Sequence, residues 1–139
     1  MQAVAPVRHR SGILEGMTDP RALAGRQRAH AYLRHLEQGD VVAADTLLAE
    51  IDDRADLVFI GAELTALARR TARLLSPAEK AQATGRQMRL QELRNAGAAS
   101  TAGLRHWIGA SATETLGLLS RTIPDQAERL AELERGAAG

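Results

Sequence analysis

Three kinds of residue in this 139-residue chain could do chemistry: a run of acids, four histidines and a cluster of arginines. The acids are Glu50, Asp52, Asp53 and Asp56, and hard divalent cations prefer such oxygen ligands. The run lacks the Gly and Glu that an EF-hand loop needs, and no second acidic pair with ligand spacing lies nearby. We therefore interpret it as a solvated loop whose acids favour the N-terminus of the next helix, and we predict no metal and no cofactor.

The histidines do not predict a catalytic or zinc site. His30 and His35 are five residues apart, about 140° around a helix, so they do not converge on one metal ion. His9 stands near the N-terminus, and His106 is expected to point away from the apolar face that includes Trp107. The chain has no cysteine, which excludes disulfide and thiolate chemistry. No nucleophile elbow, Walker loop or dinucleotide-binding glycine pattern occurs, so we predict no catalytic residue.

Cations clustered in residues 64–94 are a better candidate for a binding surface. They are Arg69, Arg70, Arg73, Lys80, Arg86, Arg89 and Arg94. The planar guanidinium of Arg suits the recognition of carboxylates and phosphates. Like charges at i, i+3 and i, i+4 repel each other, so such a face does not favour folding by itself. The partner-binding residues that we predict are Arg69, Arg70, Arg73, Arg86 and Arg89.

Two interpretations of this cluster stay open. Residues 37–63 carry eight acidic residues and one Arg, a net charge of −7, whereas residues 64–94 carry a net charge of +5. Blocks of opposite charge either pair within a fold or face a partner. If the cluster faces a partner, a protein is the first hypothesis for that partner. The second hypothesis is a nucleic-acid-binding regulator that also uses Arg8 and Arg10. Against it stand the total charge of +1 and the three aromatic residues, which are few for base stacking.

Small uncharged residues form a second candidate surface in the segment 101–122. Gly109, Thr113 and Gly117 are expected on one side of a helix, away from its apolar face. Each glycine there costs about 1 kcal/mol relative to alanine, and the close approach of another helix is one reason to retain it. The ridge either packs against a helix of the same chain or forms the seam of an oligomer.

These surfaces need a scaffold that positions them, and the sequence predicts an all-α one. The chain is rich in Ala, Leu, Arg and Glu and poor in β-branched and aromatic residues. Capping residues at Asp19, Asp40 and Ser76 mark helix starts. Apolar residues at helical spacing predict a single-domain bundle of five or six helices. The segment of about 55–75 has the widest apolar surface, so we expect it to be the central helix.

The bundle is expected to span residues 18–136. Residues 1–17 are predicted to be a flexible basic arm, with a second candidate translation start at Met17, and residues 137–139 to be a frayed tail. No stretch is apolar and long enough to span a membrane, and no secretion signal is evident, so we expect a cytoplasmic protein. The leading hypothesis is a non-enzymatic interaction or regulatory module that binds a protein partner or a second copy of itself. A small helical enzyme without a recognisable motif is the third hypothesis.

Overall fold

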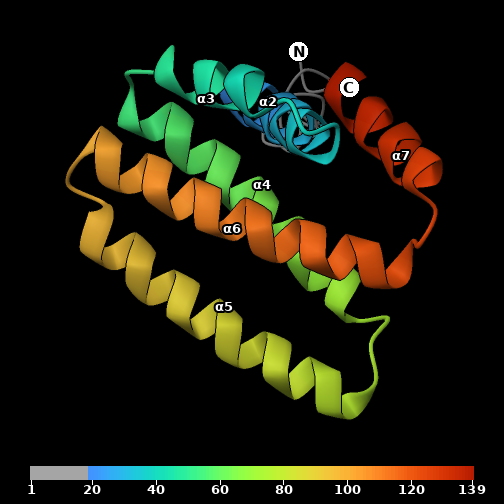
Figure 1. The fold of residues 1–139 in the computed structure, drawn as a ribbon. Coiled ribbons are helices and arrows are strands. Elements are labelled where there is room, and N and C mark those ends of the chain that lie inside the picture. The colour runs from blue at the N-terminus through green and yellow to red at the C-terminus, as the bar shows by residue number, and fades with distance from the viewer. Residues whose placement is uncertain (1–18) are drawn as a thin grey trace, which may run out of the picture.

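The computed structural model describes residues 19–139, and these form six α-helices and no strand (Figure 1). The helices are α2 (Pro20–Glu37), α3 (Val41–Ala49), α4 (Arg54–Ala72), α5 (Pro77–Gly97), α6 (Thr101–Thr122) and α7 (Gln126–Ala138). The all-α prediction is therefore confirmed. The predicted arm, residues 1–17, lies outside the described residues. Helix α7 continues past Gly136, where the sequence suggested an end, to Ala138.

Each helix begins after a side chain that accepts a hydrogen bond from a backbone N–H of its first turn. The caps are Asp19, Asp40, Asp53, Ser76, Ser100 and Asp125. A cap of this kind satisfies one of the backbone donors that a helix start leaves without a partner. The predicted starts at Asp19, Asp40 and Ser76 are confirmed, whereas the other three caps were not predicted.

Helices α4 and α6 form the centre of the bundle, and α2 packs against α4 (Figure 1). Leu57, Ile60 and Leu64 on α4 and Leu104 and Ile108 on α6 are all fully buried or within 1% of it. Burying a side chain of this size contributes roughly 1.5–3 kcal/mol to the free energy of unfolding. The prediction that the helix at about 55–75 is central is confirmed.

Trp107 on α6 brings three helices together. A Cβ atom added to Gly61 of α4 would lie 2.1 Å from the indole ring, so glycine is what allows the ring to rest on the α4 backbone. The guanidinium carbon of Arg94, on α5, lies 5.5 Å from the ring centroid. Such a cation–π contact is worth about 0.5–1 kcal/mol at a surface. The indole thus fastens both α4 and α5 to α6.

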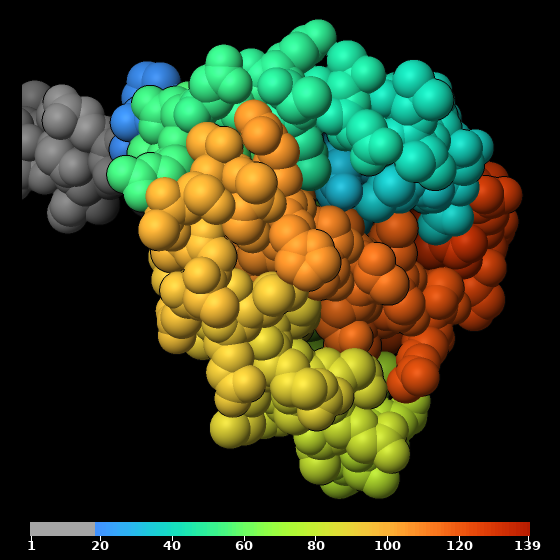
Figure 2. Space-filling model, turned by 60° about the vertical axis from the view of Figure 1, so that its left-hand side comes forward, coloured from blue at the N-terminus to red at the C-terminus, as the bar shows by residue number. Residues whose placement is uncertain are grey.

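The outer helices are α7 and α5. Helix α7 packs on α2, where Arg129 Nε lies 2.5 Å from Glu37 Oε1 and both side chains are largely buried. Helix α5 lies along α6 on the opposite side of the molecule from α3 (Figure 1), and Figure 2 shows it as the lower edge of the surface. Ala83 is the one residue of α5 that is buried. One side of α5 therefore remains open towards α4.

Candidate partner-binding groove

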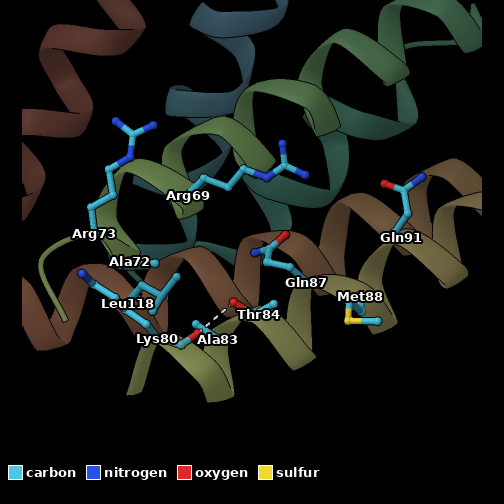
Figure 3. Close-up of a pocket in the computed structure, with 10 residues that line it drawn as sticks. All are labelled: Arg69, Ala72, Arg73, Lys80, Ala83, Thr84, Gln87, Met88, Gln91 and Leu118. Carbon is cyan, nitrogen blue, oxygen red and sulfur yellow. Dashed lines mark hydrogen bonds between the residues drawn. The ribbon is translucent and has the colours of Figure 1, made fainter. Parts of the chain in front are cut away.

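A groove of about 470 Å³ lies between the C-terminal part of α4 and the N-terminal part of α5, with α6 beneath it (Figure 3). It is lined by Arg69, Ala72, Arg73, Lys80, Ala83, Thr84, Gln87, Met88, Gln91 and Leu118. Binding pockets of proteins commonly have volumes of about 300–1,000 Å³. The groove is therefore large enough to take several side chains of a ligand.

Small side chains at the junction of three helices keep the groove open. Ala72 of α4, Ala83 of α5 and Leu118 of α6 form its floor, and the last two are each 2% exposed. Ser76 caps α5 soon after α4 ends, so the chain folds back beside itself. Ala83 and Leu118 are thus already covered by their neighbours, and the apolar lining residues that expose surface to the groove are Ala72, which is half-buried, and Met88 at the rim.

Three cations stand on the walls. Arg69 and Arg73 lie one turn apart on α4, and Lys80 lies on α5 across the groove (Figure 3). No carboxylate of residues 19–139 forms an ion pair with any of the three. Within the described chain their charge is thus uncompensated by a direct contact, and it is available to an anionic ligand group.

The rest of the α5 wall is polar or flexible. Thr84 donates a hydrogen bond to the carbonyl oxygen of Lys80 at 3.0 Å. The amides of Gln87 and Gln91 can each donate and accept hydrogen bonds. Met88 is 63% exposed, although a thioether of this size is usually covered. These residues were not predicted to bind a partner, and the signal that could have found them is their helical spacing on either side of Ala83.

The five predicted partner-binding arginines do not share one face. Only Arg69 and Arg73 line the groove. Arg89 is exposed on α5 but lies outside the groove. Arg70 and Arg86 are engaged by carboxylates of the same chain, as described next. The structure thus brings together two of the predicted residues and adds Lys80 to them.

Internal ion pairs hold Arg70 and Arg86. Arg70 Nη2 lies 3.3 Å from Glu63 Oε2, and neither residue lines the groove. Arg86 Nε lies 2.6 Å from Glu114 Oε1 of α6, and the side chains of this pair are 29% and 12% exposed. Arg86 therefore fastens α5 to α6, which is a structural contact rather than an open cationic site.

The acidic block of residues 37–63 is not a general counter-surface for these cations. Its member Glu63 pairs with Arg70. Asp45 on α3 and Glu50 at its end form no ion pair within residues 19–139. Helix α3 lies on the far side of the α4 and α6 layer from α5 (Figure 1). The acids of α3 thus lie on the opposite side of the fold from the cations of α5.

The predicted ridge of small residues on α6 is not packed along its length within the chain. Thr113 and Gly117 are exposed, and a Cβ added to Gly117 would meet no atom within 4 Å. A Cβ on Gly109 would lie 3.7 Å from the hydroxyl of Tyr32. Gly109 and Thr113 instead line an open depression of about 610 Å³ beside α3, together with Tyr32 and Asp45. Burial, and then the charge of Asp45, raises the pKa of Tyr32, so this phenol stays protonated at neutral pH.

The groove offers binding chemistry rather than acid–base chemistry. No His, Asp or Glu lines it, so its one titratable amine, Lys80, has no partner there for proton transfer. The buried histidine of the described residues, His30, lies elsewhere and donates from Nδ1 to the carbonyl oxygen of Arg26 at 2.8 Å. Among residues 19–139, no group of three or more His, Cys, Asp or Glu side chains is placed to hold a metal ion. None of the helices in this range combines the length and hydropathy needed to cross a bilayer.

Comparison with known proteins gives no family for this chain. It matches no protein-family profile, no curated protein and no solved structure.

Proposed function

We propose that this chain is a non-enzymatic interaction module that binds a protein partner in the groove between α4 and α5. The observation that carries the proposal is the pairing of an apolar floor with cationic walls that no carboxylate of residues 19–139 neutralises. Interfaces between proteins combine apolar contact at the centre with polar groups at the rim. The proposal includes the regulatory role and the cytoplasmic setting that we expect from the sequence.

Two features favour a protein over a nucleic acid as the partner. Arg70 and Arg86 are held by internal carboxylates, which reduces the number of cations available for phosphates. No aromatic side chain lines the groove, whereas single-stranded nucleic acids are commonly bound by stacking on such side chains. The lack of an acid–base pair in the groove also favours binding over catalysis.

The test is a comparison of two doubly substituted proteins that change the net charge equally. One carries Arg69→Glu and Arg73→Glu in the groove. The control carries Arg26→Glu and Arg89→Glu, which reverse two exposed arginines outside it. Because all four side chains are exposed, we expect each double variant to unfold within about 1 kcal/mol of the wild type. Urea denaturation checks this before any binding is compared.

Affinity capture from nuclease-treated host lysate then reads out binding. We expect proteins that co-purify with the wild type and the control variant to be lost from the groove variant. An equal loss from both variants would mean that diffuse charge, and not the groove, holds the partner. Proteins that the wild type captures from untreated lysate but not from nuclease-treated lysate would instead support the nucleic-acid hypothesis.

A further inference from the structure

We infer that the ligand of the groove is an amphipathic α-helix that carries acidic side chains beside its apolar face. The inference rests on the proposed function, because it names the chemistry of the partner for the same groove. Four features support it: the length of the α5 wall, the apolar floor, the spacing of the cations, and the lack of surfaces for other kinds of peptide.

The shape of the groove suits a helix of about three turns. Its lining residues on α5 run from Lys80 to Gln91 at intervals of three and four residues. Eleven residue steps of a helix span about 16 Å. A helix of similar length laid along this wall would place side chains at i, i+4 and i+7 towards the floor, which is the usual pattern of helix-in-groove recognition.

The floor would accept the apolar face of that helix. Ala72, Ala83 and Leu118 leave room above them because the first two are small. Met88 stands at the rim with 63% of its surface exposed. Its unbranched thioether can adopt several rotamers and adjust to the shape of a partner. Covering Met88 and the exposed part of Ala72 removes apolar surface from water, which favours association.

The cations set the charge of the ligand. Arg69 and Arg73 are four residues apart on α4, and side chains at this spacing have Cβ atoms about 5–6 Å apart. Two Glu side chains at i and i+4 of a bound helix have the same spacing, so each can face one guanidinium. Arginine and carboxylate can form bidentate pairs. Lys80 on the opposite wall adds a third positive charge that a basic or neutral helix would leave unpaired.

Other kinds of peptide find no matching surface here. An extended peptide adds to the exposed edge of a sheet, and residues 19–139 contain no strand. A polyproline helix docks against aromatic side chains, and none lines the groove. A phosphorylated segment would bind through the same cations, and the inorganic phosphate control described below tests for it.

The experiment uses the full chain and the methyl signal of Met88. The chain has three methionines, so ¹³C-methyl labelling gives a simple spectrum, and Met88→Leu assigns the groove signal. The probe is a designed acidic peptide of about 14 residues with Leu at helical spacing and Glu at i and i+4 beside it. Three control peptides have the same length: one has Lys for Glu, one has a central Pro, and one is a scrambled sequence.

We expect the acidic peptide to shift the Met88 signal and to bind at least about tenfold more tightly than each control peptide. We expect Arg69→Glu with Arg73→Glu to weaken its binding at least about tenfold and to bind the Lys peptide instead. The control variant with Arg26→Glu and Arg89→Glu should bind the acidic peptide within about twofold of the wild type. Thr84→Trp, which fills the groove from an exposed position, should also weaken it.

Several results would overturn the inference. One is no shift of Met88 at about 1 mM acidic peptide, a concentration that detects even weak binding. Another is equal binding of the Pro peptide, because that would mean that no helix is needed. The same shift with inorganic phosphate would assign the groove to an anion alone. A shift that depends on protein concentration without peptide would assign it to a second copy of the chain.

The peptide experiment tests the inferred ligand and the capture experiment tests the proposed function, so each can fail without the other. If the groove variant loses a captured protein but no peptide shifts Met88, the groove binds a protein partner of another shape. If the acidic peptide binds but capture is independent of the groove, the peptide chemistry holds and the proposed function is wrong.

Discussion

At Gly61 the lack of a side chain determines how closely α4 and α6 approach. The indole of Trp107 occupies the place where a Cβ would stand, at 2.1 Å, and this ring is 3% exposed. Gly117 on α6 is the opposite case, because a Cβ there would meet no atom within 4 Å. Both are glycines in helices, so the sequence alone gives them the same helix-propensity cost. Only their surroundings show that one is needed for packing.

We expect Gly61→Ala and Gly117→Ala to change the free energy of unfolding in opposite directions. Gly61→Ala should destabilise by about 1–3 kcal/mol, since the methyl group must displace the ring. Gly117→Ala should stabilise by up to about 1 kcal/mol, because alanine favours a helix. Urea denaturation of each variant measures both changes.

Gly117→Ala also tests the predicted seam of Gly109, Thr113 and Gly117. If the ridge forms an oligomer seam, the alanine should weaken self-association, measured by sedimentation over a range of concentrations, while the monomer stays folded. A destabilised monomer would mean instead that Gly117 lies against another part of the chain.

At the scale of the helix, some of the N-caps could be predicted from the sequence and others could not. Asp19-Pro20 and Ser76-Pro77 are distinctive pairs, because Asp or Ser stands before a Pro that fits the first helical turn. Asp53 is one of three aspartates in five residues, and side-chain type does not tell which one caps α4. Geometry selects Asp53, whose carboxylate accepts from the backbone N–H of Ala55 at 2.8 Å. Fold class and helix order could therefore be predicted more fully than the individual caps.

We expect the Asp53 cap to make the stability of α4 depend on pH. The backbone N–H of Ala55, and next the guanidinium of Arg21, hold the pKa of Asp53 below its usual value. A lowered pKa in the folded state means that this stabilisation is complete above the unfolded pKa of about 3.9 and is lost as pH falls through the folded pKa. Asp53→Ala should thus lower Tm at pH 7, and its difference from the wild type should narrow below about pH 4.

The matched control for this cap is Asp52→Ala. The Asp52 side chain is 96% exposed and lies 3.6 Å from Arg105, so its removal should change Tm little at either pH. Thermal melting followed by far-ultraviolet circular dichroism measures all three proteins. An Asp53→Ala difference that is constant from pH 7 to about pH 3 would contradict a cap that depends on the carboxylate.

At the scale of the whole molecule, α3 and α5 lie on opposite sides (Figure 1), whereas the central helix α4 carries residues of both charge blocks. The sequence located the cations but did not show which are neutralised. Glu63 stands seven residues before Arg70, and Glu114 follows Arg86 by 28 residues. Whether such residues meet depends on side-chain directions and helix packing. The groove also depends on helix packing, because it exists only where α5 packs on α6 and stands away from α4.

The last prediction separates two neighbouring arginines that the sequence placed on one face. Arg70→Glu would set a second carboxylate beside Glu63, whose side chain is 16% exposed and lies 3.9 Å from His30. We expect it to lower the free energy of unfolding by about 1 kcal/mol, from the lost ion pair and the new repulsion. Arg73→Glu removes no ion pair within residues 19–139 and should change stability by less than about 0.5 kcal/mol.

Binding should follow the reverse order. We expect Arg73→Glu to weaken capture of the partner strongly, because Arg73 lines the groove, and Arg70→Glu to leave capture nearly unchanged in the folded fraction. Glu63→Gln added to Arg70→Glu should recover most of the lost stability, since it removes the repulsion between the two carboxylates. Urea denaturation and quantitative capture measure the two effects on the same samples. A folded Arg70→Glu protein that fails to capture the partner would move the binding surface from the groove to the opposite side of α4.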